Sequence, residues 1–311
     1  MRAIAIATLV GCGFRVEAQA PPDDGARDAS GGEATTDGMP GDGPVPDTSA
    51  PTCVQRWSQG PTILTPSPIG GINTGNSEGD PFVTFDELAI YVASNGDIYR
   101  ATRASTSAGF GGRTLDTNLS SSTNDSKVSF TADGLTAFIG SERSGGEGAT
   151  DVWRGTRATA AGSFTFDQMH LAAVNDGMAQ WDPHISRDGL RLYLAPIGNG
   201  GAQHVAVATR GAPSAAFGTP QTISELQSTV VDNDPTLTAD ERVIVFASNR
   251  DGTRKLWYAT RADPTGAFGT PQVVPNVDNG DDGPHLSSDG CRLYFTSQRG
   301  GSADIYVAAV N

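Results

Sequence analysis

A pattern that recurs about every fifty residues constrains the fold of this chain more than any other feature. One recurring element is an aspartate, usually followed by proline, whose successive members lie 45, 57, 52 and 48 residues apart. The members are Asp80, Asp125, Asp182, Asp234 and Asp282, called the marker aspartates below. A period of roughly 40–50 residues indicates one structural unit repeated side by side.

Two further markers keep the same period. A Thr-Arg pair ends one segment of four units, and its arginines are Arg103, Arg157, Arg210 and Arg261. An aromatic residue lies in the loop that follows, and the aromatic residues are Trp57, Phe110, Phe164, Phe217 and Phe268. Because three separate markers agree, we expect five copies of one unit.

Each unit contains four short segments in which apolar and polar residues alternate, as they do in half-buried strands. Examples are residues 285–287, 292–297 and 304–310 of the last copy, and residues 271–274, which follow the aromatic loop of the copy before it. An Asp-Gly pair such as Asp289-Gly290 leads from residues 285–287 into residues 292–297, because glycine takes the positive φ of a hairpin turn without a steric penalty. The sequence therefore predicts an all-β protein, a five-bladed β-propeller of four-stranded antiparallel blades.

The order of the segments predicts how the ring closes. In chain order after the marker aspartate, residues 285–287, 292–297 and 304–310 are the first, second and third segments of a unit, and the fourth follows the aromatic loop, as at 271–274. The chain starts with a segment of the fourth type, residues 62–64, and ends with one of the third type, residues 304–310. We expect the N-terminal strand to complete the last blade, which hides a strand edge that would otherwise pair with other chains. The propeller domain is predicted to span residues 53–311.

The motif D-P-x-[apolar]-S-x-D-G-x-x-[apolar]-[aromatic]-x-x-S resembles the WD-repeat-like repeat of TolB-type β-propellers. It matches best from Asp182 to Tyr193 and from Asp282 to Ser297, and the resemblance covers about residues 57–311. The chain departs from the pattern where Asp125 lacks its proline and where Asp240-Glu241 replaces Asp-Gly. The TolB type also has six blades, whereas this chain has five repeats.

The N-terminal sequence predicts that the protein is located in the bacterial cell envelope. Arg2 precedes a short apolar run that ends in Leu9-Val10-Gly11-Cys12, which resembles the lipobox of bacterial lipoproteins. The resemblance implies a signal peptide at residues 1–11 and lipidation of Cys12, with membrane contact only through the lipid. Alternatively, cleavage after Ala18-Gln19-Ala20 would give a secreted protein.

Residues 12–52 have the composition of a disordered linker. They are rich in Pro, Gly and acidic residues and have too few apolar residues to offset the entropy of ordering the chain. The net charge of the chain, −14, excludes nucleic acid as a partner, because a phosphate backbone is bound by a basic surface. We expect a monomeric domain held away from the membrane.

Two groups of residues could bind a metal at the face where the marker aspartates lie. The five aspartates could form a ring that holds a divalent cation, or each could cap its own turn. His184 and His285 both follow a marker proline, and with Asp182 and Asp282 they could ligate a transition metal. Otherwise they are ordinary strand residues, matched by Phe82, Lys127 and Thr236 in the other units.

The cysteines that remain once Cys12 carries lipid are Cys53 and Cys291. Cys53 precedes the strand that should close the ring, and Cys291 begins the second strand of the same blade. In an oxidising compartment we expect them to form a disulfide that locks the ring.

The sequence favours a binding module over an enzyme. No P-loop, dinucleotide or hydrolase motif is present, and no cofactor is expected apart from such a cation. We predict a scaffold that engages an envelope protein or glycan through the face of the marker aspartates. The alternative is a carbohydrate-active enzyme, because some pectin-degrading lyases also resemble this repeat and use a metal with histidine ligands.

Overall fold

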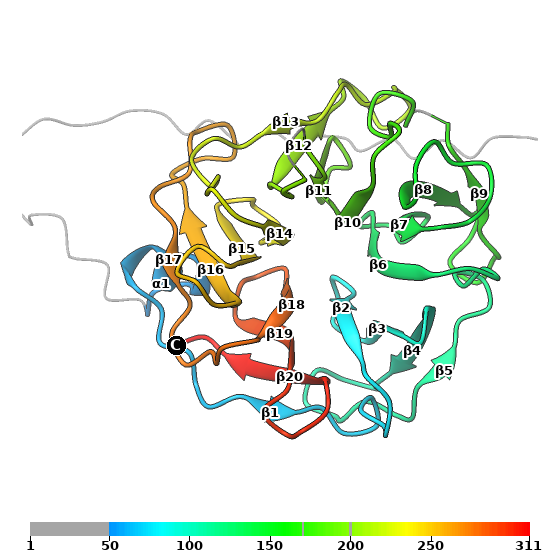
Figure 1. Ribbon diagram of the computed structural model, residues 1–311. Helices are drawn as coiled ribbons and strands as arrows, with labels where there is room; N and C mark the ends of the chain where they lie inside the picture. The colour runs from blue at the N-terminus through cyan, green and yellow to red at the C-terminus, as the bar shows by residue number, and fades with distance from the viewer. Residues whose placement is uncertain (1–49, 170, 199–200) are drawn as a thin grey trace, which may run out of the picture. The chain divides into compact units, whose positions relative to one another are not determined.

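The computed structural model describes residues 50–169, 171–198 and 201–311, which form five antiparallel four-stranded sheets around a central axis (Figure 1). The innermost strand of each sheet, β2, β6, β10, β14 or β18, lies nearest the axis. This is a five-bladed β-propeller, as the repeat predicts. The predicted signal peptide, Cys12 and the predicted linker up to residue 49 lie outside the described residues.

The first three blades follow the chain in order. The first consists of β2 (Gly79–Val83), β3 (Ala89–Ser94), β4 (Asp97–Thr102) and β5 (Thr114–Leu115). The second consists of β6 (Asp125–Phe130), β7 (Thr136–Ser141), β8 (Asp151–Thr156) and β9 (Thr165–Asp167). The third consists of β10 (Gln180–Ile185), β11 (Arg191–Pro196), β12 (Ala206–Thr209) and β13 (Gln221–Thr222).

The last two blades complete the ring. The fourth consists of β14 (Asp232–Leu237), β15 (Val243–Ser248), β16 (Lys255–Thr260) and β17 (Gln272–Val273). The fifth consists of β18 (Asp282–Leu286), β19 (Arg292–Ser297), β20 (Asp304–Ala309) and β1 (Ser67–Pro68). The only α-helix among the described residues is α1 (Cys53–Gln59), which precedes β1.

The hydrophobic core lies between the blades, because each sheet buries both faces against its two neighbours. There are five clusters, one at each junction. Representative pairs, from the first junction to the last, are Phe82 and Phe130, Phe138 and Leu192, Tyr193 and Phe246, Val245 and Phe295, and Tyr294 and Ile90. The apolar residues of the repeat therefore hold the ring together and leave its two ends for polar side chains.

The arginine and aromatic markers form one structural device. The guanidinium of Arg103 lies over the ring of Phe110 at 4.5 Å, and its Nε donates to the carbonyl of Glu87 in the turn of the same blade. The same stacking and the same bond to a turn carbonyl recur for Arg157, Arg210 and Arg261. These two markers recur because each blade needs the contact to fix its outer loop on its turn.

The fifth blade has no such arginine, and Trp57 of α1 takes its place. The indole Nε1 of Trp57 donates to the carbonyl of Gly290 at 2.9 Å, the bond that an arginine makes in the other four blades. Trp57 is 1% exposed and packs in the cluster between the fourth and fifth blades. Thr52 caps α1 with a capping box, and a disulfide joins Cys53 to Cys291.

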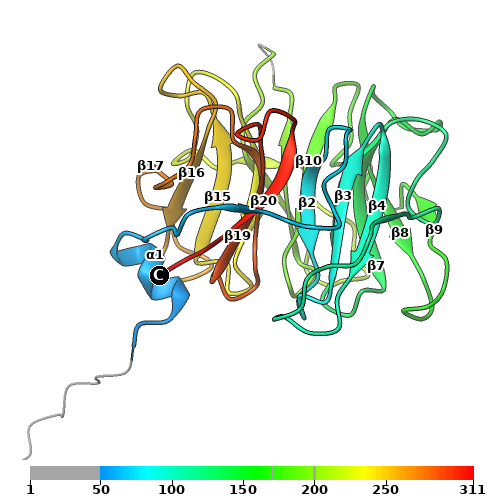
Figure 2. The same cartoon turned by 90° about the horizontal axis from the view of Figure 1, so that it is seen from below.

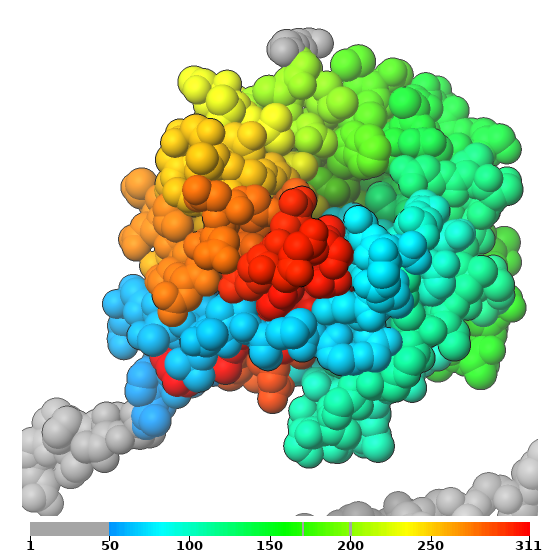
Figure 3. All heavy atoms as spheres, turned by 60° about the horizontal axis from the view of Figure 1, so that its bottom comes forward, coloured from blue at the N-terminus to red at the C-terminus, as the bar shows by residue number. Residues whose placement is uncertain are grey.

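The first residues of the propeller lie along its last strand. β1 pairs with β20 through Ser67 and Val307, and Ile63 makes an isolated bridge to Val310. Residues 62–64, where the sequence predicts this strand, also pair with the end of the chain, because the Thr62 N–H donates to the Asn311 carbonyl and the Leu64 N–H to the Ala309 carbonyl. The regular ladder of β1 follows at Ser67–Pro68. Figure 2 shows α1 beside the C-terminus, and Figure 3 shows the blue N-terminal residues running along the red C-terminal strand.

Candidate functional site

A bulge at the start of each inner strand creates the polar end of the ring. In all five blades the pairing between the first and second strands shifts just after the strand begins. Asp80, Asp182 and Asp234 lie at this bulge with φ of 50°, 61° and 56°. Aspartate tolerates this left-handed conformation better than most residues, which explains why it recurs here. We call the end of the channel lined by Asp80, Asp182, Asp234 and Asp282 the channel mouth.

Two marker aspartates do not occupy the bulge position. In the second blade Asp125 pairs with Ser141, and the register places Lys127 at the bulge. Asp125 is 1% exposed and accepts hydrogen bonds from Ser141 Oγ and Arg143 Nη2. It corresponds to Asp232, which Ser248 and Arg250 hold in the same way. The sequence alignment of Asp125 with the other markers is therefore wrong, because Asp125 stands two residues before the bulge.

In the fifth blade the bulge residue is Gly283, with φ of 50°. Asp282 precedes it by one residue, and its side chain is 41% exposed. Since Gly283 has no side chain, Asp282 supplies the carboxylate of this blade at the channel mouth.

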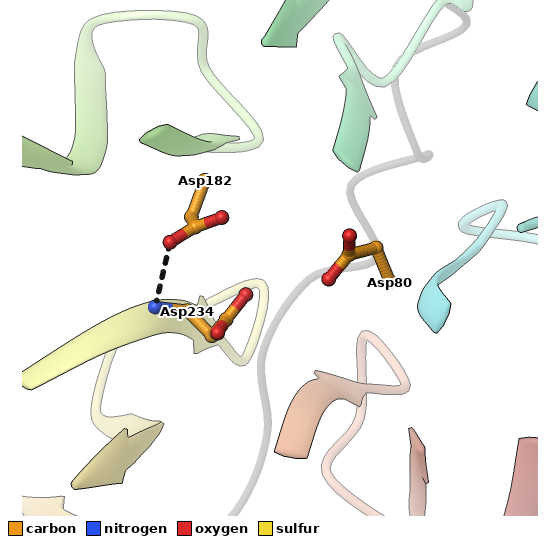
Figure 4. Close-up of side chains that lie close together, drawn as sticks. All are labelled: Asp80, Asp182 and Asp234. Carbon is orange, nitrogen blue, oxygen red and sulfur yellow. Dashed lines mark hydrogen bonds between the residues drawn. The ribbon is translucent and has the colours of Figure 1, made fainter. Parts of the chain in front are cut away.

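Three carboxylates from three different blades converge at the channel mouth (Figure 4). Oxygen atoms of Asp80, Asp182 and Asp234 all lie within 4.8 Å of one another. Asp182 and Asp234 are 6% and 5% exposed, whereas Asp80 is partly exposed. Asp182 also accepts a hydrogen bond of 3.2 Å from the backbone N–H of Asp234. Such close carboxylates repel one another strongly unless protons or cations neutralise them.

Two basic side chains neutralise part of this charge. Lys127 is 2% exposed, and its Nζ lies 3.5 Å from Asp234 Oδ1. Arg254 Nη2 lies 3.1 Å from Asp234 Oδ2 and 2.5 Å from Asp282 Oδ1. The four carboxyl groups of the channel mouth thus face two cations, which leaves a surplus of two negative charges when all are ionised.

The pKa values show how the protein accommodates this surplus. Burial, reinforced by Asp234, raises the pKa of Asp80 to about 7 and raises that of Asp182 well above its usual range. The same two causes raise the pKa of Asp282 to about 6, although solvent reaches part of its side chain. Burial also acts to raise the pKa of Asp234, but Lys127 and Arg254 outweigh it and hold that pKa below its usual value. Near neutral pH, protons on these carboxyl groups therefore neutralise part of the surplus negative charge.

We expect Asp80→Asn to make the protein more stable at pH 8. Between about pH 4 and 7 the folded state keeps the Asp80 proton while the unfolded state loses it, so wild-type stability falls as the pH rises through that window. Asparagine also tolerates the positive φ of residue 80. Because Asp80 is partly exposed, the gain at pH 8 should be about 1–2 kcal/mol. Urea denaturation at pH 4, 6 and 8 measures it.

The control is Asp278→Asn, since the Asp278 side chain is 61% exposed. Its stability should keep the wild-type dependence on pH. If Asp80→Asn also kept that dependence, the raised pKa of Asp80 would be refuted.

His184 and His285 lie deeper in the channel and bridge neighbouring blades. His184 Nε2 accepts a hydrogen bond of 3.3 Å from the Leu237 N–H, and His285 Nε2 lies 3.1 Å from the Val83 carbonyl oxygen. Burial, together with nearby positive charge, lowers the pKa of both, that of His285 to about 3, so both are neutral at pH 7. In the strand register, the positions equivalent to the two histidines hold Phe82, Ser129 and Thr236 in the other blades. The prediction from the sequence that Lys127 is the equivalent residue of the second blade is therefore wrong.

The metal ligands predicted from the sequence are not brought together as one set. Among the described residues, the group of potential ligand atoms within 4.8 Å contains Asp182 with Asp80 and Asp234, and it does not contain His184, His285 or Asp282. The group of potential ligands in the structure thus consists of carboxylates alone, whereas the set predicted from the sequence includes two histidines. Carboxylate oxygens suit hard cations such as Ca²⁺ better than transition metals.

The fold and the channel mouth together define the class of this protein as a five-bladed β-propeller with a carboxylate cluster on its axis. No protein-family model matches the chain, and no curated protein matches it either. No helix among residues 50–169, 171–198 and 201–311 is long and apolar enough to cross a membrane.

Several solved structures are similar in fold. A thermostable family-43 glycoside hydrolase is 14% identical with a TM-score of 0.54, and the match covers 80% of this chain and 92% of that one. The GH43_1 enzyme from Xanthomonas citri, solved with xylotriose, is 16% identical with a TM-score of 0.53 over 83% and 92% of the two chains. A TolB protein from Agrobacterium tumefaciens is 18% identical with a TM-score of 0.47 over 72% and 71%. At these identities the likeness establishes the propeller fold alone.

Proposed function

We propose that this protein is an envelope-anchored binding module whose channel mouth takes up a cationic group through Asp80, Asp182 and Asp234. The observation that carries the proposal is the surplus of two negative charges that the four carboxylates of the channel mouth, Asp282 included, have over Lys127 and Arg254. A cation bound there would replace the protons that the cluster holds near neutral pH. Binding at this end would leave the opposite end of the ring free.

The cationic group could come from either of two sources. A divalent cation would supply the two missing charges and find several carboxylate oxygens, the ligands that Ca²⁺ prefers. An ammonium group of an envelope protein or glycan would make the kind of contact that Lys127 Nζ already makes with Asp234. Both sources share one chemistry, a cation held by the three carboxylates.

An enzyme that acts on carbohydrate is the second candidate. The pKa of Asp80 is raised and that of Asp234 is lowered, although the two carboxyl groups are neighbours. A general acid and a general base in an active site differ in the same way. The similar family-43 structures are glycoside hydrolases by name. However, Asp182 and Asp234 are almost fully buried, so a sugar ring would have little access to them. Their burial supports the uptake of a small cationic group over catalysis on a glycosidic bond.

The proposed location rests on the sequence. Leu9-Val10-Gly11-Cys12 resembles a lipobox, and lipidation of Cys12 would hold the propeller at a membrane surface in the bacterial envelope. The acidic, Pro- and Gly-rich residues up to 52 would then serve as the spacer.

Calorimetric titration of the full chain with two probes tests the proposal. We expect either CaCl₂ or the diamine cadaverine to bind at pH 8 with one site per chain, and the probe that binds identifies the source of the cation. Asp182→Asn should weaken that binding about tenfold or more, because one of three carboxylates loses its charge. Asparagine keeps an oxygen that can accept from the Asp234 N–H, so the fold should persist.

Asp278→Asn, which removes an exposed carboxylate, should leave the affinity unchanged. The proposal fails if neither probe binds at millimolar concentration, or if Asp182→Asn binds as tightly as the wild type.

A further inference from the structure

The junction between the third and fourth blades holds a buried carboxylate. Glu241 of the turn between β14 and β15 is 4% exposed. Its carboxylate accepts hydrogen bonds of 2.6 Å from Arg191 Nε and 2.6 Å from the Tyr193 hydroxyl. Arg261 Nη2 lies 3.6 Å from the same carboxylate. One tyrosine and two arginines thus form a receptor for a carboxylate.

The junction between the fifth and first blades repeats this arrangement. Glu87 is 7% exposed, and both of its carboxylate oxygens accept from Arg292 Nη1, at 2.9 and 2.8 Å. The Tyr294 hydroxyl donates to Glu87 at 3.0 Å, and Arg103 Nη2 lies 3.2 Å away. The chain therefore builds the same receptor twice and fills it each time with a glutamate of its own turn.

The junction between the first and second blades has the receptor without the glutamate. Tyr91 of β3 occupies the place of Tyr193 and Tyr294, and Arg157 occupies that of Arg261. The turn residue is Gly134, which has no side chain to occupy this receptor. Ala89 replaces the first arginine of the other two receptors, which opens further space.

Two adjoining cavities occupy this place, with volumes of about 400 and 470 Å³. They share Thr84, Asp86, Tyr91, Arg157 and Ala160 among their lining residues. Arg100 lines the larger cavity and supplies a second guanidinium in place of the missing arginine. We call the two cavities together the inter-blade groove; it lies at the turn end of the inner strands, opposite the channel mouth.

Three acidic residues border the inter-blade groove, and each accepts hydrogen bonds within its own turn. Asp116 accepts from the Asn118 N–H at 3.0 Å. Asp86 accepts from Thr84 Oγ1 at 2.6 Å and from the Leu88 N–H at 3.0 Å. Asp133 accepts from Thr131 Oγ1 at 2.6 Å and from the Leu135 N–H at 2.9 Å. In the described part of the chain, no ion pair joins any of these three carboxylates to Arg157 or Arg100.

The Tyr91 hydroxyl remains a proton donor near neutral pH. Burial raises the pKa of Tyr91; the positive charge of Arg100 lowers it, the negative charge of Asp116 raises it, and Arg157 lowers it again. Both guanidinium groups are therefore close to the hydroxyl, in a part of the groove that is largely shielded from water.

The geometry points to a second binding site: we propose that the inter-blade groove binds the carboxylate of a small organic acid. The carboxylate would take the place of the Glu87 and Glu241 side chains, held by Tyr91, Arg157 and Arg100. Phe82, Phe85 and Phe130 line the adjoining cavity and suit an apolar or aromatic body. This site does not depend on the function proposed for the channel mouth.

The protein's own turns supply the test variant, Gly134→Glu. Glu87 and Glu241 adopt φ of 55° at the corresponding position, close to the 65° of Gly134. A Cβ atom at residue 134 would lie 3.5 Å from Arg157 Nη2, an ordinary contact. The variant should therefore fold, and its new carboxylate should occupy the receptor.

Titration of the full chain with benzoate, followed by calorimetry, tests the site. We expect benzoate to bind and the uncharged benzamide to bind at least about tenfold more weakly, because a hydrogen bond to a charged group is worth more than one to a neutral group. Gly134→Glu should abolish benzoate binding. Tyr91→Phe should weaken it about tenfold, and this fold tolerates phenylalanine there, since Phe138 is the corresponding residue of β7.

The matched control is Gly189→Glu, the same change in the turn of the third blade, where φ is 71°. It should leave benzoate affinity at the wild-type value. The proposal is overturned if benzoate does not bind, if benzamide binds equally well, or if Gly134→Glu or Tyr91→Phe binds benzoate like the wild type.

Discussion

Replacing Trp57 by alanine should lower the free energy of unfolding by about 3–5 kcal/mol, the usual cost of removing a large buried aromatic side chain. Trp57 is 1% exposed, packs against Tyr258 with ring centroids 5.1 Å apart, and gives the fifth blade the turn contact that arginines give the others. The variant loses the packing and leaves the Gly290 carbonyl without its donor. Urea denaturation, monitored by far-UV circular dichroism because the variant loses a tryptophan, measures the change.

Trp57→Phe is the matched control for this prediction. It keeps an aromatic ring in the cluster between the fourth and fifth blades but cannot donate to Gly290. We expect it to cost about 1–2 kcal/mol, the range for a lost hydrogen bond and a modest change of volume. If the free energy of unfolding of Trp57→Ala lay within about 1 kcal/mol of the wild-type value, α1 would not support the ring.

Removing the disulfide with Cys53→Ser and Cys291→Ser together should be comparably destabilising. The two cysteines are 238 residues apart in the sequence, so the bond closes a loop that includes almost the whole propeller. The chain-entropy treatment gives on the order of 4–5 kcal/mol for such a loop, which is an upper value. The urea midpoint of the double variant should fall well below that of the oxidised wild type.

Reductant provides the control for the disulfide. It should lower the midpoint of the wild type to that of the double variant and leave the double variant itself unchanged. Equal midpoints for oxidised and reduced wild type would contradict a stabilising role for this bond.

The period of the sequence predicts the fold because each marker has a physical cause that acts in every blade. Arg103 and Phe110 recur as a stacked pair, and the Asp-Gly turns recur because a hairpin needs a positive φ. Where Glu87 and Glu241 replace glycine, the sequence shows only a departure from the repeat. The structure shows the reason, which is that these side chains fill the junction with the preceding blade.

The composition of the channel mouth is harder to predict. Asp125 matches the marker pattern but stands at the position of Asp232, because the second blade reaches its bulge at Lys127. Spacing alone does not reveal a shift of two residues when the proline is missing. Arg254 comes from the loop before β16, and no repeated signal marks it, since among the described residues no other arginine is paired with the aspartates of the cluster.

Proton release on cation binding tests the central claim of this account most directly. With the probe that binds, calorimetry in buffers of different ionisation enthalpy counts the protons displaced per cation. Because the pKa of Asp80 is raised to about 7 and that of Asp182 is raised well above its usual range, we expect about one proton or more to be released at pH 7, and fewer at pH 9. Binding at pH 7 with no proton released, or with the same number at both pH values, would contradict a cation site formed by these aspartates.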